Sequence, residues 1–245
     1  MASAPIVSNR PLAMLVVAGV IYFLIQTATP EGAIPEENVH PGFNKQFREP
    51  DVSEFVGRFE REDREVYENR ERILEALDLR PGMSVADVGA GTGFYSLMLA
   101  QAVGPSGRVY AQDISQAFLE SVRKRAAEAG LKNIETVLGA DRDARLPKDS
   151  VDLVFICDTY HHFEYPRNML ASIRRALREG GVLVIVDFDR VEGQSREWIL
   201  DHVRIGRRGV ISEVARAGFD LVDSPPADYL KENYILRFRK RAANR

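Results

Sequence analysis

The sequence has few cysteines, few histidines and little net charge. Of its 245 residues one is a cysteine, Cys157, and four are histidines. A single cysteine excludes an intramolecular disulfide bond and a metal site built from clustered cysteines. The formal net charge is −3, so the chain as a whole gives no electrostatic reason to expect a nucleic acid as partner. What remains is an ordinary globular composition, 45% hydrophobic and 28% charged, in a chain long enough to bury one sizeable core.

One apolar run stands apart from the rest of the sequence. "PLAMLVVAGVIYFLI" (11–25), extended to residue 28, reaches about the lower limit for a membrane span. We therefore expect residues 1–30 to be a signal peptide or a membrane anchor, with a core helix as the alternative. Residues 31–50 are rich in proline, glycine and acid and are predicted to be a linker. Arg10 before the run and acids after it favour export, but one cation leaves the side of the membrane open.

Dense charges of both signs accompany a helical pattern in residues 51–81. Apolar residues recur there at helical spacing, and "RPG" (80–82) ends the pattern, which predicts an N-terminal cap of two helices. The segment "SREWILDHVRIG" (195–206) is the second predicted cover of a pocket. Five side chains in these two segments are candidates for contact with a substrate: Arg58, Tyr67, Trp198, His202 and Arg204.

From residue 82 onward, strand-like and helical segments alternate. The predicted strands are 83–89, 108–114, 133–139, 151–158 and 181–188. The helical segments between them are 94–103, 115–129 and 166–178. Such alternation predicts a parallel sheet with helices on both faces. A helix over 196–217, then strands at 219–225 and 233–240, predict an antiparallel pair at one sheet edge.

The glycine-rich stretch "VADVGAGTGFYS" (85–96) follows the first of these strands. A dinucleotide fingerprint needs a third glycine at position 94, which is Phe94; here the third glycine is Gly93, after Gly89 and Gly91. Asp87, at the strand end, would repel a pyrophosphate but attract an ammonium group. S-adenosylmethionine carries an ammonium and a sulfonium and has no phosphate, so the acid favours this cofactor over a dinucleotide.

The stretch "VADVGAGTG" resembles motif I of the class I S-adenosylmethionine-dependent methyltransferases. The resemblance implies a Rossmann-like sheet of seven strands over residues 82–245, mostly parallel with an antiparallel edge pair. It also implies that Gly89, Ala90 and Gly91 form a wall against the methionine and ribose parts of the cofactor. Gly93 completes the turn, and Asp87 belongs to the same cofactor site.

Two further acids follow in the order that the resemblance implies. Asp113, at the tip of the next strand, can accept hydrogen bonds from both ribose hydroxyls, with Ile114 beside it. The alternative is that Asp113, or Ser115, only caps the following helix. The loop "LGADRDARLP" (138–147) is similar to the family's adenine-contacting loop. Three of its residues are candidates there: Asp141 first, then Asp143, with Arg142 between them.

The fourth strand leads into "CDTYHHFEYP" (157–166), where the methyl acceptor is expected. Its polar residues Asp158, Tyr160, His161 and His162 are the catalytic candidates, and Asp158 is also assigned to the cofactor. The resemblance to methyltransferases of quinone biosynthesis extends to this His-His-Phe stretch. A base is needed only when the acceptor loses a proton, and histidine suits that role near neutral pH. The alternative is that a histidine only packs or orients the loop.

A metal site was considered at the strand ends. Asp158, Asp187 and Asp189 could surround a magnesium ion, as in catechol-type O-methyltransferases. The fuller motif of those enzymes is not evident, so no metal ligand is assigned. "KENY" (231–234) is a further segment that could close the far side of the pocket.

The sequence predicts an enzyme that moves a methyl group from S-adenosylmethionine to a small, apolar acceptor through an oxygen, carbon, nitrogen or sulfur atom. A thiol S-methyltransferase and a metal-assisted O-methyltransferase are the specific alternatives. A nicotinamide-dependent oxidoreductase and a non-catalytic scaffold that binds the cofactor are less favoured. Residues 11–28 add a possible association with membranes. No Asn-Pro-Pro-Tyr type of motif follows the fourth strand, which disfavours nucleic-acid and protein substrates.

Overall fold

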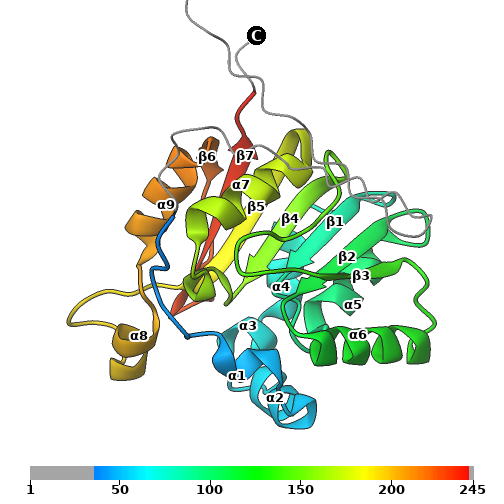
Figure 1. The fold of residues 1–245 in the computed structure, drawn as a ribbon, viewed down its shortest axis with the longest axis horizontal. Coiled ribbons are helices and arrows are strands. Elements are labelled where there is room, and N and C mark those ends of the chain that lie inside the picture. The colour runs from blue at the N-terminus through cyan, green and yellow to red at the C-terminus, as the bar shows by residue number, and fades with distance from the viewer. Residues whose placement is uncertain (1–35, 243–245) are drawn as a thin grey trace, which may run out of the picture. The chain divides into compact units, whose positions relative to one another are not determined.

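The computed structural model describes residues 36–242 of the chain. Its strands form one sheet of order β3-β2-β1-β4-β5-β7-β6 (Figure 1). They are β1 (Ser84–Val88), β2 (Arg108–Asp113), β3 (Ile134–Leu138), β4 (Val151–Cys157), β5 (Leu177–Phe188), β6 (Phe219–Asp223) and β7 (Asn233–Lys240). The first five run parallel, and β7 pairs antiparallel with both β5 and β6. The predicted Rossmann-like sheet with an antiparallel edge is confirmed.

Helices cover both faces of this sheet. They are α1 (Lys45–Arg48), α2 (Val52–Phe59), α3 (Glu65–Glu68), α4 (Arg70–Ala76), α5 (Phe94–Val103), α6 (Gln116–Glu128), α7 (Pro166–Ala176), α8 (Glu197–His202) and α9 (Arg207–Arg216), with a 3₁₀ turn η1 (Tyr160–His162). Alternate residues of a strand face opposite sides. Val85 thus packs with Leu99 of α5, while Ala86 packs on the other face with Ile173 of α7 and Val210 of α9.

Two helical predictions differ from the structure. The cap of two helices contains three, α2, α3 and α4. The single helix expected over 196–217 is divided into α8 and α9. The break ends at Gly206, where a Cβ atom would lie 2.6 Å from the carbonyl oxygen of Arg190. The backbone therefore passes close to another loop at this point, which a continuous helix would prevent.

Residues 36–50, within the predicted linker, pack against the loop that follows β4. We call this segment the strap. The backbone nitrogen of Val39 donates to the carbonyl oxygen of Glu164 (2.9 Å), and the side-chain amide of Asn44 donates to the carbonyl oxygen of His162 (3.0 Å). The linker prediction did not anticipate these contacts. They hold the strap beside the expected acceptor loop.

The membrane prediction concerns a different part of the chain. The proposed signal peptide or anchor, residues 1–30, lies outside the described residues. Within residues 36–242, no helix combines the length and the apolar character needed to cross a bilayer.

Candidate functional site

A cavity of about 610 Å³ opens at the carboxyl ends of the parallel strands. Four residues at the carboxyl ends of these strands line the cavity: Asp87 of β1, Asp113 of β2, Cys157 of β4 and Phe188 of β5. Asn233, at the start of the antiparallel β7, reaches the same edge. In open α/β sheets this crevice is where ligands bind.

The glycine loop after β1 is fixed by close packing. Gly89, Gly91 and Gly93 have φ values of +80°, +52° and +85°, which side chains other than glycine rarely adopt. A Cβ atom on Gly89 would clash with Thr159, and one on Gly93 would lie 2.7 Å from Val122 Cγ2. Gly89, Ala90 and Gly91 line the cavity, while Gly93 caps α5. The loop therefore presents backbone, without side chains, to a ligand.

Asp113 faces the cavity with a fixed carboxylate. Its Oδ2 accepts a hydrogen bond from the backbone nitrogen of Gly91 (2.8 Å), and its Oδ1 accepts one from that of Ser115 (2.9 Å). Ser115 itself caps α6, so the helix-cap alternative applies to Ser115. Burial raises the pKa of Asp113 to about 6, against these hydrogen bonds, which lower it. Ile114 lines the cavity beside it.

Asp87 is a buried acid in the same wall. The hydroxyl of Ser96 donates to its Oδ2 (2.6 Å). Burial raises the pKa of Asp87 to about 7; the Ser96 hydroxyl opposes the rise and the nearby Asp113 charge adds to it. A cation entering the cavity would favour the ionised form of this carboxyl group. Asp87 is thus suited to an ammonium group, as the sequence predicts.

Asp158 is held between two side chains that the sequence analysis missed. The guanidinium of Arg64 lies 2.8 Å from its Oδ2, and the amide of Asn233 donates to its Oδ1 (2.6 Å). Burial raises the pKa of Asp158, and the Arg64 charge opposes that rise. Arg64 and Asn233 line the cavity as well. The only hint in the sequence was the segment 231–234, which contains Asn233.

The two neighbouring histidines occupy different surroundings. His161 Nδ1 lies 2.6 Å from Asp187 Oδ1, and the His161 backbone nitrogen donates to Asp187 Oδ2 (3.0 Å). Asp187 therefore fixes the orientation of this ring. His162 lies among Phe43 and Phe47 of the strap, at centroid distances of 4.8 and 4.9 Å. Burial lowers the pKa of His162 well below its usual value, which keeps the ring neutral.

A group of aromatic side chains lines the cavity beside the ends of β4 and β5, and we call this part of the cavity the aromatic end. Phe47 comes from the strap, Phe188 from the end of β5, and Trp198 and His202 from α8. Trp198 packs against Phe188 with a centroid distance of 5.0 Å and against His202 at 5.5 Å. Burial lowers the pKa of His202 to about 4. Besides Trp198 and His202, the predicted cover residues Arg58 and Tyr67 also line the cavity.

Some predicted site residues have other partners and are absent from the described lining of the cavity, among them Tyr160, Arg204 and Arg142. Tyr160 is fully buried, and its hydroxyl donates to Glu213 Oε2 (2.8 Å). Arg204 pairs with the same carboxylate at 2.8 Å. Arg142 stacks its guanidinium over the ring of Tyr165, 3.6 Å from the centroid. This geometry does not support a catalytic role for Tyr160, an adenine contact by Arg142 or a substrate contact by Arg204.

The two acids of the predicted adenine loop lie in different surroundings. Asp141 lines the cavity, where the guanidinium of Arg48 from α1 lies 2.6 Å from its Oδ2. Asp143 is paired with Arg175 at 2.9 Å instead. The ion pair between Arg48 and Asp141 joins the strap to this loop.

The magnesium hypothesis gains no support from the strand-end acids. Asp158 is committed to Arg64 and Asn233, as described above. Asp187 is committed to His161, and Asp189 Oδ1 accepts from the backbone nitrogen of Arg207 at 3.3 Å. Among the described residues, these three acids do not form a group that could hold a metal ion.

A sheet of this order, with a glycine loop after β1 and an acid after β2, defines the class I fold of S-adenosylmethionine-dependent methyltransferases. A family model described as "Methyltransferase domain" matches residues 79–216. A solved S-adenosylmethionine-dependent methyltransferase from Aquifex aeolicus superposes with a TM-score of 0.68 at 24% identity, over 78% of this chain and 100% of that one.

Curated relatives match part of the chain. An uncharacterized 37.1 kDa protein in transposon TN4556 of Streptomyces fradiae is 38% identical over 160 residues, 60% of this chain and 45% of its own. The ubiquinone/menaquinone biosynthesis C-methyltransferase UbiE of Bordetella parapertussis is 34% identical over 46% of this chain and 43% of its own. The demethylmenaquinone methyltransferase of Listeria monocytogenes is 30% identical over 48% of this chain and 50% of its own. The chain spans about half the length of the curated relatives it matches.

The family model covers more than half of the chain. The chain therefore belongs to the methyltransferase domain family, and its fold is that of the S-adenosylmethionine-dependent methyltransferases. The prediction of S-adenosylmethionine as cofactor is confirmed at the level of this family.

Proposed function

We propose that this enzyme methylates a small, apolar acceptor that contains a ring, such as a quinol. The observation that supports this most directly is the lining of the cavity. Buried acids at the ends of β1 and β2 suit a cationic cofactor, and Phe47, Phe188 and Trp198 line the same cavity. Aromatic walls bind flat apolar ligands through stacking and burial. The relatives named as quinone-biosynthesis methyltransferases agree with such an acceptor.

In this proposal the cofactor lies along the carboxyl ends of β1 and β2. Asp87 holds the ammonium group, Asp113 accepts from both ribose hydroxyls, and Asp141 accepts from the exocyclic amine of adenine. The methyl group then points from the glycine-loop end toward the aromatic end. Most of the rate comes from holding the acceptor atom in line with the sulfonium. His162, neutral and aimed at this space, is the candidate base where the acceptor must lose a proton.

We also propose that residues 11–28 bring the enzyme to a membrane. An apolar acceptor partitions into the bilayer, so an anchored enzyme would meet it at a raised local concentration. A reporter fused after residue 40 tests this idea by showing whether the following domain is exported or retained.

Calorimetric titration of S-adenosylmethionine into the purified chain tests the cofactor part of the proposal. We expect Asp113→Ala to weaken binding at least tenfold, because it removes a charged acceptor of two hydrogen bonds. Asp143→Ala is the matched control: this acid follows the neighbouring strand β3, pairs with Arg175 and is absent from the described lining of the cavity. Equal affinities in the two variants would contradict the assignment of Asp113.

Transfer of a labelled methyl group then tests the acceptor. We expect labelling of a hydroquinone with a short apolar tail and none of a polar amine of equal size. Trp198→Ala should raise KM for the hydroquinone while leaving the affinity for S-adenosylmethionine unchanged. Preferential methylation of the polar amine would refute the acceptor class and leave the cofactor site intact.

A further inference from the structure

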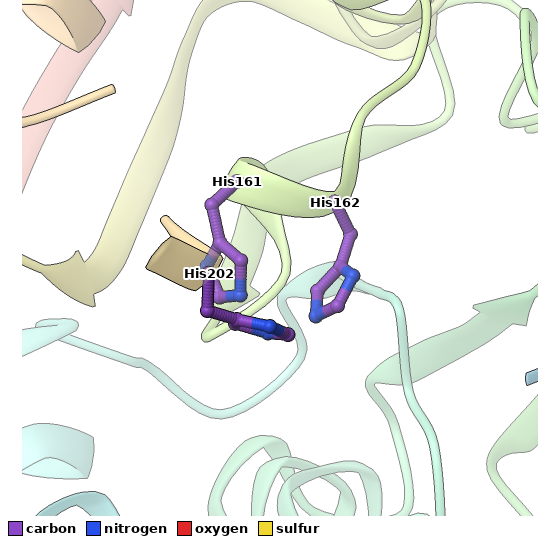
Figure 2. Close-up of side chains that lie close together, drawn as sticks. All are labelled: His161, His162 and His202. Atoms are coloured by element: carbon purple, nitrogen blue, oxygen red, sulfur yellow. The ribbon is translucent and has the colours of Figure 1, made fainter. Parts of the chain in front are cut away.

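Three of the four histidines of this chain meet at the aromatic end of the cavity. One ring nitrogen from each of His161, His162 and His202 lies within 4.8 Å of the other two. Figure 2 shows the three rings turned toward one another, two from η1 and one from α8. The ring centroids of His161 and His162 are 4.2 Å apart, and His202 is 5.2 and 5.3 Å from them.

The surroundings of each ring leave a nitrogen free for this common space. Asp187 occupies Nδ1 of His161, so the Nε2 atom of that ring is left for another ligand. A carboxylate behind a histidine is the usual support of a metal-binding imidazole, because it fixes the tautomer and the orientation of the ring. The Nδ1 atom of His162 is buried and has no hydrogen-bond partner among the described residues.

We propose that His161, His162 and His202 bind one divalent transition-metal ion of the zinc type. Zinc takes neutral imidazole nitrogens at about 2.1 Å, which places them roughly 3.4 Å apart around the ion. Each ring nitrogen therefore has to move inward by about 1 Å, a shift within the range of side-chain rotation.

Three protein ligands leave a fourth position, and this position faces the cavity. All three histidines line the cavity beside Phe188 and Trp198. Three ligands with one open place are typical of catalytic zinc, whereas structural zinc sites are closed by four protein ligands. The histidine pair in one loop gave no sign of this site in the sequence, because the third ligand lies 40 residues away, at the end of α8.

The role of the ion rests on the proposed function, whereas its binding does not. A phenolic hydroxyl of the acceptor that takes the open position would release its proton to solvent at a lower pH than it does in water. An electron pair of the resulting phenolate then forms the bond to the methyl carbon. The bond from that carbon to sulfur breaks, and the sulfonium becomes a neutral thioether. With the ion bound, His162 is a ligand and no longer the base, so the ion itself supplies the deprotonated acceptor and holds it against the aromatic wall.

Cobalt(II) is the probe for the metal site, because its visible absorption reports four-coordinate binding. The full chain is freed of metal with a chelator and titrated with Co²⁺, and then with Zn²⁺ as competitor, without cofactor or acceptor. We expect one Co²⁺ per chain with four-coordinate absorption that one equivalent of Zn²⁺ abolishes. His202→Gln should weaken Co²⁺ binding at least tenfold. If His202→Gln fails to fold, His162→Gln replaces it, with the same expected loss.

His40→Gln is the matched control. His40 stacks on Phe43 at 3.8 Å, next to the cluster, but contributes no nitrogen to the group of three. We expect its Co²⁺ affinity to stay within twofold of the wild type. The absence of four-coordinate absorption in the wild type, unchanged binding in both ligand variants, or equal losses in His40→Gln and His202→Gln would overturn the metal site.

Removal of the ion separates this inference from the proposed function. We expect the chelator-treated chain to keep its affinity for S-adenosylmethionine and to lose methyl transfer to a hydroquinone at least tenfold, with recovery on addition of Zn²⁺. Full activity in a chain shown by elemental analysis to lack metal would overturn the role of the ion. A chain that binds metal but not S-adenosylmethionine would instead refute the cofactor assignment.

Discussion

Asp87→Asn should stabilise the empty enzyme at alkaline pH. Burial raises the pKa of Asp87 to about 7, roughly three units above its ordinary value of 3.8. Because the folded-state pKa is the higher one, the stability contributed by the protonated group is fully present below pH 3.8. It is lost as the pH rises through 7. At 1.36 kcal/mol per unit, the ionised carboxylate costs the fold about 4 kcal/mol at pH 8. Asparagine keeps the acceptor for the Ser96 hydroxyl (2.6 Å) and has no charge to bury.

The assay is urea unfolding of both proteins at pH 5 and at pH 8, without cofactor. At pH 5 the folded wild type is already protonated at this site. The advantage of the variant in unfolding free energy should therefore grow by about 3 kcal/mol between the two pH values. The same substitution should weaken binding of S-adenosylmethionine at least tenfold, since the ammonium group loses its counter-charge. An advantage that is equal at both pH values, or a variant that binds the cofactor as well as the wild type, would refute this reasoning.

Two further predictions concern the loop and the buried ion pair. Gly89→Ala should lower the unfolding free energy by about 2–4 kcal/mol, because the added methyl group clashes with the β4 loop at a φ of +80°. Gly57 lies in α2, and a Cβ atom added there would meet no neighbouring atom within 4 Å, so Gly57→Ala should raise the unfolding free energy by up to about 1 kcal/mol. If urea unfolding shows equal losses of unfolding free energy in the two variants, the packing argument is wrong. Arg64→Ala should lower it by about 2 kcal/mol by leaving Asp158 ionised without its cation. Adding Asp158→Asn should restore part of this loss, whereas a purely additive double variant would show that the two side chains are not coupled.

The parts of the site that the sequence predicted well are local in the chain. Gly89, Gly91 and Gly93 are required by backbone angles within one turn, and Asp113 and Asp141 follow strands whose carboxyl ends meet at one edge of the sheet. The alternation of strands and helices establishes this edge before any side-chain partner is known. For these residues, order along the chain is enough to predict position.

The contacts that the sequence did not predict depend on partners far away in sequence. Tyr160 lies in the expected loop, but its hydroxyl donates to the carboxylate of Glu213, 53 residues later. Arg64 and Asn233 come from the first and last described parts of the chain and converge on Asp158. A charged residue on a cap helix looks the same in the sequence whether it is solvated or buried beside an acid. Only the packing of the cap against the sheet separates the two cases.

The place of β7 in the sheet has a consequence for how the enzyme is made. β7 follows β5 and β6 in the chain but lies between them in the sheet. During synthesis one edge of β5 therefore stays unpaired until residues 233–240 have been made. This strand contains Leu183, Val184 and Ile185, which are buried in the folded protein. An exposed apolar edge of this kind invites pairing with another chain. Asn233 is part of β7, so pairing of this strand both covers the open edge of β5 and brings Asn233 to Asp158.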